Sequence, residues 1–266
     1  MAETAAAPQD EVLYEVSDHI ATITINREQF QNTISGVMLD ALTHYLLEAD
    51  RDRDVRCIIL TAHGRFFCAG LDLRSGRVGD SDAGNSTNLD LRSTPPTVMH
   101  NLDTPTICAL NGSAAGYGMD MALGCDIRLM AEEAKMAAAF TARGIVPESG
   151  GTWILPRLLG WSKAAELIFT GRTLKADECL ELGLVSHVVP AVEVHARARD
   201  LALEICANAP LAVQASKRMM RMGMNETFND HVHHVFLQLL PLFKTEDFKE
   251  GMASFMEKRK ADFKGR

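Results

Sequence analysis

The sequence has no excess of positive charge and no long apolar run. Its 27 lysine and arginine residues are outnumbered by 35 aspartate and glutamate residues, which gives a net charge of -8 at pH 7. Such a chain has no general attraction to phosphate backbones, so we expect no nucleic-acid partner. No stretch approaches the roughly 18 consecutive apolar residues of a membrane span, residues 1–10 resemble no signal peptide, and the last residues, FKGR, match no peroxisomal tail. We therefore expect a soluble, cytoplasmic protein with no membrane partner.

Cysteine is sparse, and several nucleotide and hydrolase motifs are missing. The six cysteines include no C-x-x-C pair and lie mostly inside apolar runs: Cys57, Cys68, Cys108, Cys125, Cys179 and Cys206. We predict reduced thiols in the core rather than a disulfide framework or a metal site. The sequence also lacks G-x-x-x-x-G-K-S/T, G-x-S-x-G and the dinucleotide fingerprint, so nothing indicates a P-loop, an α/β-hydrolase or a nicotinamide cofactor.

Short β-branched segments alternate with a helical pattern along the first 190 residues. The segment 35–50 starts at a plausible N-cap, Ser35, and places Met38, Leu42, Tyr45 and Leu46 on one face. Buried strands are predicted for five segments bounded by turn residues: 19–26, 55–62, 104–112, 126–131 and 184–189. This alternation of strands and helices predicts an α/β fold.

The C-terminal quarter is predicted to be helical. Strand signals end at Pro190, and helical patterns follow at 193–208, 211–223, 227–240 and 245–259. We divide the chain into a core at 11–200 and a helical subdomain at 201–266, whose mixed apolar and charged pattern suits either packing on the core or covering a neighbouring subunit. The Gly/Ser/Asp/Asn-rich stretch 75–93 is predicted to be a long loop and a candidate lid.

Two glycine-rich turns follow predicted strands and have a chemical meaning. Gly70 allows a sharp turn that points the N–H groups of Leu71 and Asp72 into a cleft. Gly116 and its neighbouring glycines place the N–H of Tyr117 at a helix start, where anions are favoured. Two such donors are the ingredients of an oxyanion hole. Read alone, the same glycines are equally typical of tight strand-to-helix connections.

At these turns the sequence resembles the crotonase family, the enoyl-CoA hydratases and isomerases. The resemblance runs from about residue 12 to 264 and is sharpest in FFCAGLDL, ALNGSAAGYGMDMALGCDIRL, GIVPESGGTWILPRLLG, ADECLELGLVSHVVP and EGMASFMEKRKADF. It implies a crotonase-like spiral of ββα units with a C-terminal helical trimerisation region. It also implies acyl-CoA substrates, no cofactor apart from the CoA of the substrate, and homotrimers or hexamers built as dimers of trimers.

The resemblance assigns roles to individual residues. The N–H groups of Leu71 and Tyr117 would hold the thioester oxygen as an enolate. Residues from the first turn would lie along the CoA, and two from the tail would approach the CoA of a neighbouring subunit. These CoA-binding candidates are Ala69, Leu71, Asp72 and Leu73 from the turn, and Phe255 and Lys258 from the tail.

Two carboxylates are the candidate catalytic groups, because moving a proton beside a thioester needs a carboxylate within reach. Asp120 follows the second turn, and Glu148 lies in VPESGG. Without the resemblance, Asp120 could equally be a charge at a helix N-terminus, and Glu148 could be a capping or solvated loop acid. By the resemblance, Asp120 occupies the position of the first catalytic glutamate of the hydratases, and the second maps onto Phe140. Glu148 matches the position of the catalytic acid in double-bond isomerases.

These positions favour double-bond isomerisation over hydration, because a phenylalanine cannot activate water. A true enoyl-CoA hydratase that uses Asp120 and Glu148 together is the first alternative. The second is a catalytically silent crotonase fold that binds RNA or protein, which the two well-placed acids and the net negative charge argue against. The histidines His231, His233 and His234 are predicted to be a solvated or intersubunit helix face rather than metal ligands.

Overall fold

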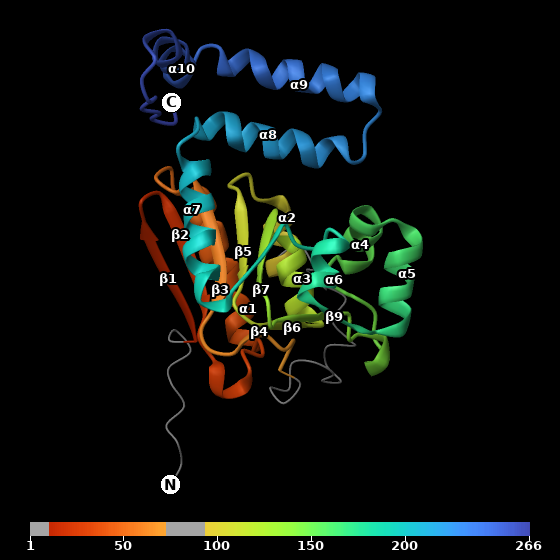
Figure 1. Cartoon of the computed structure of the whole chain (residues 1–266). Coiled ribbons are helices and arrows are strands. Elements are labelled where there is room, and N and C mark those ends of the chain that lie inside the picture. The colour runs from red at the N-terminus through yellow and green to blue at the C-terminus, as the bar shows by residue number, and fades with distance from the viewer. Residues whose placement is uncertain (1–10, 73–93) are drawn as a thin grey trace.

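The computed structural model describes residues 11–72 and 94–266 (Figure 1). Its larger sheet has six strands, parallel except for an antiparallel first pair. In spatial order they are β1 (Val12–Ser17), β2 (Ile20–Ile25), β3 (Cys57–Ala62), β5 (Thr106–Leu110), β7 (Ile127–Ala131) and β10 (His187–Val189). The five predicted strands are confirmed as β2, β3, β5, β7 and β10, whereas β1 was not predicted.

A second sheet consists of four strands of three residues each. They are β4 (Phe66–Cys68), β6 (Ser113–Ala115), β8 (Lys135–Ala137) and β9 (Thr173–Lys175). After β3, β5 and β7 the chain enters the smaller sheet and then a helix. This repetition is the expected spiral of ββα units, and it brings the turn after β4 beside the turn after β6 because these two strands pair in parallel.

Helices cover the two sheets and begin where the sequence supplies caps. The hydroxyl of Ser35 accepts a hydrogen bond from the N–H of Met38 at 3.3 Å, so the predicted cap of α1 is confirmed. From the predicted face, Met38, Leu42 and Leu46 are buried, and Tyr45 stacks on Tyr14. The helices around the sheets are α1 (Gly36–Arg51), α2 (Pro95–Asn101), α3 (Tyr117–Gly124), α4 (Gly151–Leu159), α5 (Trp161–Thr170), α6 (Ala176–Glu181) and α7 (Val194–Cys206).

The core lies between the larger sheet and the helices on its faces. Every residue of β3 and β5 is buried, as a parallel sheet covered on both faces requires. The six cysteines are all free thiols and all buried. Within the described part of the chain, no helix combines the length and apolarity needed to cross a membrane.

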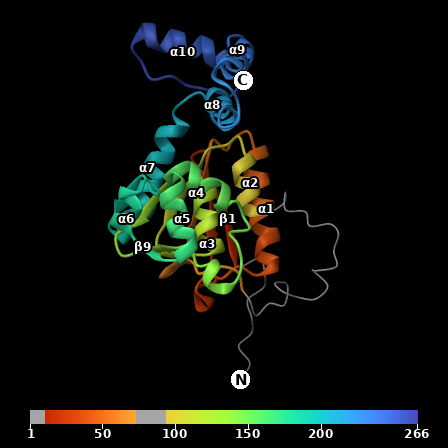
Figure 2. The same ribbon diagram turned by 90° about the vertical axis from the view of Figure 1, so that its right-hand side faces the viewer.

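The last three helices form a separate layer above the sheets (Figures 1 and 2). They are α8 (Pro210–Gly223), α9 (Phe228–Leu242) and α10 (Glu246–Glu257), and α8 lies beneath α9. The predicted boundary between residues 200 and 201 falls inside α7, a helix that packs on β3, β5 and β7. Charged contacts tie α8 to the core: Lys217 Nζ lies 2.7 Å from Asp126 Oδ2 and 2.9 Å from the Thr104 carbonyl.

Candidate active site

The two glycine-rich turns predicted from the sequence touch each other. Gly70 has a φ of +113°, and a Cβ atom on it would lie 3.3 Å from the Ala115 carbonyl oxygen and 4.0 Å from the backbone nitrogen of Tyr117. Gly118 is packed still more closely, because a Cβ there would lie 2.2 Å from the Cys68 carbonyl oxygen. The start of α3 is therefore pressed against the end of β4 in a way that only glycine permits.

Both predicted oxyanion donors have free N–H groups. On either side of Leu71, the Gly70 carbonyl accepts from the Ile34 N–H and the Asp72 N–H donates to the Ile34 carbonyl, both at 2.9 Å. The prediction that the Asp72 N–H points into the cleft is therefore wrong. Because alternate residues of an extended strand face opposite sides, the Leu71 N–H points away from Ile34. Tyr117 is the first residue of α3, so its N–H has no acceptor within the helix. Within residues 11–72 and 94–266, neither N–H meets any other acceptor.

Asp120 is buried on the first turn of α3, with 1% of its surface exposed. The backbone N–H groups of Ser149 and Gly151 lie near the carboxylate, but neither oxygen makes a hydrogen bond of regular geometry with the described residues. The start of α4 lies directly against it, since a Cβ on Gly151 would come within 2.4 Å of Oδ1. Burial raises the pKa of Asp120 to about 7, the charge of Glu148 adds to the rise, and the nearby N–H groups of Ser149 and Gly151 partly oppose it.

Glu148 lies on the loop that leads into α4 and is more open to solvent. Its partial burial still raises its pKa above the ordinary glutamate value. Its charge also raises the pKa of Asp120, so the fold brings these two predicted catalytic acids into electrostatic reach of each other. One carboxyl group that titrates near neutrality beside a second, more accessible one suits proton transfer at neutral pH.

Phe140, at the position where a second hydratase glutamate was expected, is 3% exposed. Its ring atom Cε1 lies 4.0 Å from the place where a Cβ of Gly116 would be. The aromatic ring therefore packs against the second glycine turn, one residue from the Tyr117 N–H. This side of the turn is apolar and provides no carboxylate at residue 140.

The predicted CoA-binding residues have different surroundings. Ala69 and Leu71 are partly exposed at the first turn, whereas Asp72 is buried and its Oδ2 lies 2.8 Å from Nη1 of Arg27. The sequence did not single out Arg27, which approaches from the segment after β2. Leu73 and the candidate lid at 75–93 lie outside the described residues.

Phe255 and Lys258 do not approach the candidate site of their own chain. They belong to the end of α10, which lies far from β4 and α3 in both ribbon views (Figures 1 and 2). The exposed fraction of Phe255 is 78%.

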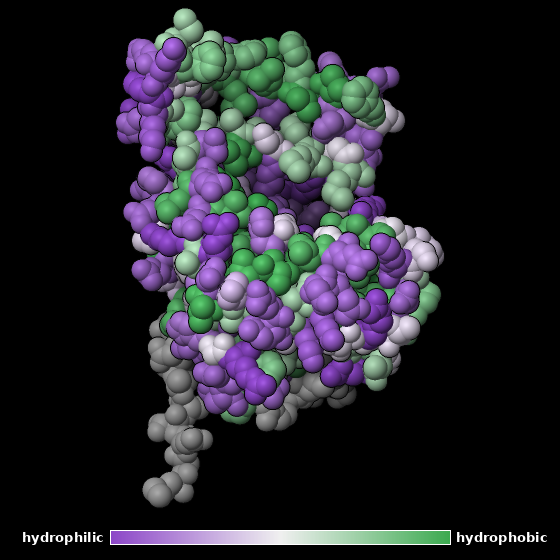
Figure 3. Space-filling view, viewed as in Figure 1, coloured by the Kyte–Doolittle hydropathy of each residue, from purple (hydrophilic) through white to green (hydrophobic). Residues whose placement is uncertain are grey.

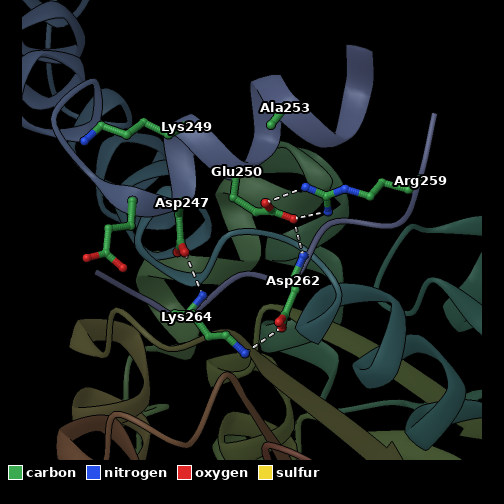
Figure 4. A pocket seen from close by; sticks show the side chains of 8 residues that line it. Asp247, Lys249, Glu250, Ala253, Arg259, Asp262 and Lys264 are labelled. Atoms are coloured by element: carbon green, nitrogen blue, oxygen red, sulfur yellow. Dashed lines mark hydrogen bonds and ion pairs between the residues drawn. The ribbon is translucent and has the colours of Figure 1, made fainter. Parts of the chain in front are cut away.

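A hollow of about 510 Å³ opens between α10 and the C-terminal tail (Figure 4). Its acids are already paired: Glu250 binds Arg259, and Asp247 accepts from the Lys264 N–H. It therefore offers no catalytic group.

The histidines predicted to be a solvated or intersubunit face lie on α9. Glu226 bridges two of them, with its carboxylate 3.0 Å from Nδ1 of His231 and 2.9 Å from Nδ1 of His234. Across the described residues, no cluster of three or more histidine, cysteine or acidic side chains is arranged to hold a metal ion.

Comparisons with known proteins agree with this geometry. The family model for enoyl-CoA hydratase/isomerase matches residues 15–266. The short-chain-enoyl-CoA hydratase of Clostridium acetobutylicum is 35% identical over 96% of this chain and 98% of its own. The 1,2-epoxyphenylacetyl-CoA isomerase of Escherichia coli is 31% identical with the same coverage.

The fold has equally close relatives among solved structures. The enoyl-CoA hydratase of Bacillus anthracis superposes with a TM-score of 0.90 and 32% identity, covering 96% of this chain and all of that one. Two free N–H donors on adjoining glycine turns, with a buried carboxyl group on the first turn of α3, suit chemistry at a thioester, in which CoA is part of the substrate and no further cofactor is needed. The chain is an enzyme of the enoyl-CoA hydratase/isomerase family, with the crotonase fold.

Proposed function

We propose that this enzyme shifts a double bond in enoyl-CoA thioesters and hydrates 2-enoyl-CoA more slowly. The observation that carries the proposal is Phe140, an apolar side chain packed against the second glycine turn. Hydration needs one group to activate water while another protonates the carbon beside the thioester. An isomerisation needs only a base that removes a proton from one carbon and returns it to another.

The proposed reaction converts a 3-enoyl-CoA into a 2-enoyl-CoA. The N–H groups of Leu71 and Tyr117 hold the thioester oxygen while Glu148 removes a proton from C2, and the electron pair spreads over a dienolate. Glu148 then returns the proton to C4, so no atom is gained or lost. Oxyanion donors of this kind contribute about 3 kcal/mol each. Asp120, with a pKa of about 7, is partly protonated at neutral pH and adds little negative charge beside the dienolate.

The second candidate is hydration of 2-enoyl-CoA. It is favoured by the 35% identity to the Clostridium protein, which is named a hydratase. In that case Asp120 and Glu148 would divide the handling of water between them. The electrostatic contact between these two acids makes such a division chemically reasonable.

We further propose that the substrate site is completed by a second subunit. α9 has fifteen residues and none of them is buried in the single chain. Exposed apolar side chains along α9 appear in green at the top of Figure 3. Large exposed apolar surfaces mark interfaces, and a trimer or a dimer of trimers would cover this one. Phe255 and Lys258 would then reach the CoA of a neighbour, while Ala69 and Leu71 hold the CoA bound to their own chain.

The decisive experiment gives the purified protein 3-hexenoyl-CoA, crotonyl-CoA and a dienoyl-CoA in separate reactions and identifies the products by mass spectrometry and chromatography. We expect 2-hexenoyl-CoA to form faster than 3-hydroxybutyryl-CoA. Glu148→Gln should lose most turnover and keep its CoA affinity, because only the proton acceptor is removed. The matched control is Glu133→Gln, an exposed acid after β7.

Two results would contradict the proposal. Rapid hydration of crotonyl-CoA without any double-bond shift would identify a hydratase. Binding of CoA thioesters without any product would identify a silent binding protein.

The cytoplasmic location and the domain division at residue 200 stay predictions from the sequence.

A further inference from the structure

A guanidinium group is buried at the far end of the helix that supplies the second oxyanion donor. Arg128 lies near the start of β7, and 7% of its surface is exposed. It forms no ion pair with the described residues; instead, Nε donates to the Leu184 carbonyl and Nη1 donates to the Cys125 carbonyl. A buried charge is costly unless other groups compensate it, so a guanidinium held by carbonyl dipoles alone needs an explanation.

The contacts of Arg128 close the C-terminal end of α3. Cys125 is the C-cap residue of this helix, and Nη1 also lies 3.5 Å from the carbonyl oxygen of Leu123 in the last turn. The last carbonyl groups of a helix have no partner within it and carry partial negative charge, which a cation stabilises. Arg128 is thus a charged cap for α3, and it comes from the strand that directly follows the helix.

The N-terminal end of α3 is open by comparison. Its N-cap residue is Gly116, which has no side chain to accept a hydrogen bond, and the Tyr117 N–H that follows is free. All eight residues of α3 are buried. The helix spans about 12 Å at its usual rise per residue, so the path from the guanidinium to this N–H runs through protein. Charges attract one another over such a path with much less screening than in water.

We propose that Arg128 is a positioning residue that caps one end of α3 and thereby strengthens the hold of the Tyr117 N–H on a negatively charged thioester oxygen. The inference deepens the proposed function and rests on it, because that function places the thioester oxygen at the N–H groups of Leu71 and Tyr117. The enolate oxygen carries more negative charge than the carbonyl oxygen from which it forms, so this attraction grows as the reaction proceeds. Arg128 therefore contributes more to kcat than to substrate affinity.

The test separates the charge of Arg128 from its hydrogen bonds. Arg128→Lys keeps the charge, whereas Arg128→Gln keeps a donor and loses the charge. Infrared difference spectroscopy measures the C=O stretching frequency of butyryl-CoA, isotope-labelled at the thioester carbonyl, in solution and bound to each protein. This frequency falls when positive charge or hydrogen-bond donors draw electrons toward the oxygen. Butyryl-CoA has no double bond to shift or to hydrate, so the spectra do not depend on which reaction the enzyme catalyses.

We expect the frequency to fall when butyryl-CoA binds the wild type, nearly as far in Arg128→Lys, and clearly less in Arg128→Gln. The kcat is measured with whichever of 3-hexenoyl-CoA and crotonyl-CoA the wild type converts. It should be about tenfold lower in Arg128→Gln than in Arg128→Lys, which is within the range of charge effects at helix ends. The dissociation constant of butyryl-CoA should differ much less between these two variants.

Arg56 provides the matched control. It donates through Nη1 to the carbonyl of Cys206, the last residue of α7, at 3.1 Å, and through Nη2 to the Phe263 carbonyl at 2.7 Å. It therefore also binds the end of a helix, but α7 supplies no proposed oxyanion donor. Arg56→Lys and Arg56→Gln should both leave the carbonyl frequency of bound butyryl-CoA at the wild-type value.

The outcomes separate this inference from the proposed function. If binding to the wild type does not lower the frequency, the thioester oxygen does not lie at the two N–H groups, and both proposals fail. If the wild type lowers it and the two Arg128 variants lower it equally, only the inference about Arg128 is wrong. A smaller fall in Arg56→Gln that matches the one in Arg128→Gln would also overturn it, because the effect would not depend on α3.

Discussion

Nη1 of Arg27 lies 2.8 Å from Oδ2 of Asp72, across 45 residues of sequence. Both side chains are nearly buried, and Arg27 also binds the Glu11 carboxylate through Nε and the Thr33 carbonyl through Nη1, each at 2.9 Å. Asp72 follows Leu71 directly. The ion pair therefore holds the segment beside the Leu71 N–H, which we propose binds the thioester oxygen. The Asp72 side chain thus has a structural contact within the chain itself.

Replacing Arg27 should damage both stability and catalysis. Arg27→Met leaves the Asp72 carboxylate buried without its guanidinium, and breaking such a pair costs about 3 to 5 kcal/mol. Urea unfolding measures this loss, and kcat should fall more than the CoA affinity. The double variant Arg27→Met, Asp72→Leu should recover much of the stability but not the rate. Arg53→Met, at an exposed position, is the control; if it has the same effect, the Arg27 ion pair has no special role.

A methyl group at Gly118 should force the two turns apart. Its Cβ would lie 2.2 Å from the backbone oxygen of Cys68, which has no room to retreat within the paired strands. Gly118→Ala should therefore lose most activity and destabilise the fold by about 2 kcal/mol or more, on the scale of overpacked cores. Gly251→Ala meets only Phe263 at 3.6 Å, so it should remain active and as stable as the wild type or more so. Activity assays and thermal unfolding of the two variants test this prediction, and equal behaviour of Gly118→Ala and Gly251→Ala would contradict it.

The buried carboxyl of Asp120 should make stability depend on pH. Its pKa rises from 3.8 to about 7 on folding, so the unfolded chain gives up this proton first as the pH increases. The free energy of unfolding therefore falls between about pH 4 and pH 7. Asp120→Asn removes this contribution and should be more stable than the wild type by about 2 to 4 kcal/mol at pH 8, with little difference at pH 4. A stability gain of the same size at both pH values would rule out ionisation as its cause.

An acid at position 140 should introduce hydration. In Phe140→Glu the new carboxylate would lie beside the second glycine turn, where the ring now contacts Gly116. It would supply the second water-handling group that the wild type lacks at this position, so crotonyl-CoA hydration should increase relative to double-bond shift. Phe140→Leu is the control, because it keeps the wall apolar. If neither variant changes the ratio of the two rates, Phe140 does not determine the reaction.

The apolar side chains of the C-terminal helices should hold subunits together. Light scattering should give a trimer or a multiple of it. A charge in place of Phe236, which is 52% exposed on α9, should weaken the assembly. Phe236→Asp should then lose activity on dilution before the wild type does, since Phe255 and Lys258 would no longer reach a neighbouring site. A dilute wild-type monomer with full activity would contradict this prediction.

Local patterns predicted the longer elements of the fold, and tertiary contacts account for what they missed. Ser35 caps α1 as its neighbours indicate, and the apolar runs became the strands of the larger sheet. The strands of the smaller sheet have three residues each, too few to show a period of two. β1 was not predicted from the sequence because it is an edge strand in which only Val12 is buried.

The site residues can also be separated into those that the sequence predicted and those that only the folded structure shows. Its glycines and acids follow one another in short motifs, so the sequence showed them. The Arg27 contact joins segments that only folding brings together, and no spacing signals it.

The six buried thiols can report local unfolding of the protein, because each becomes accessible to reagents only when its surroundings open. Burial raises the pKa of Cys68 to about 12 and that of Cys206 to about 11, so these two side chains hold almost no reactive thiolate in the native state. A thiol-specific reagent can therefore react with a buried sulfur only after the structure around it has unfolded locally. Cys206 closes α7 near the surface, whereas Cys108 lies in a central strand. The order in which these positions are labelled will therefore record which parts of the molecule open first.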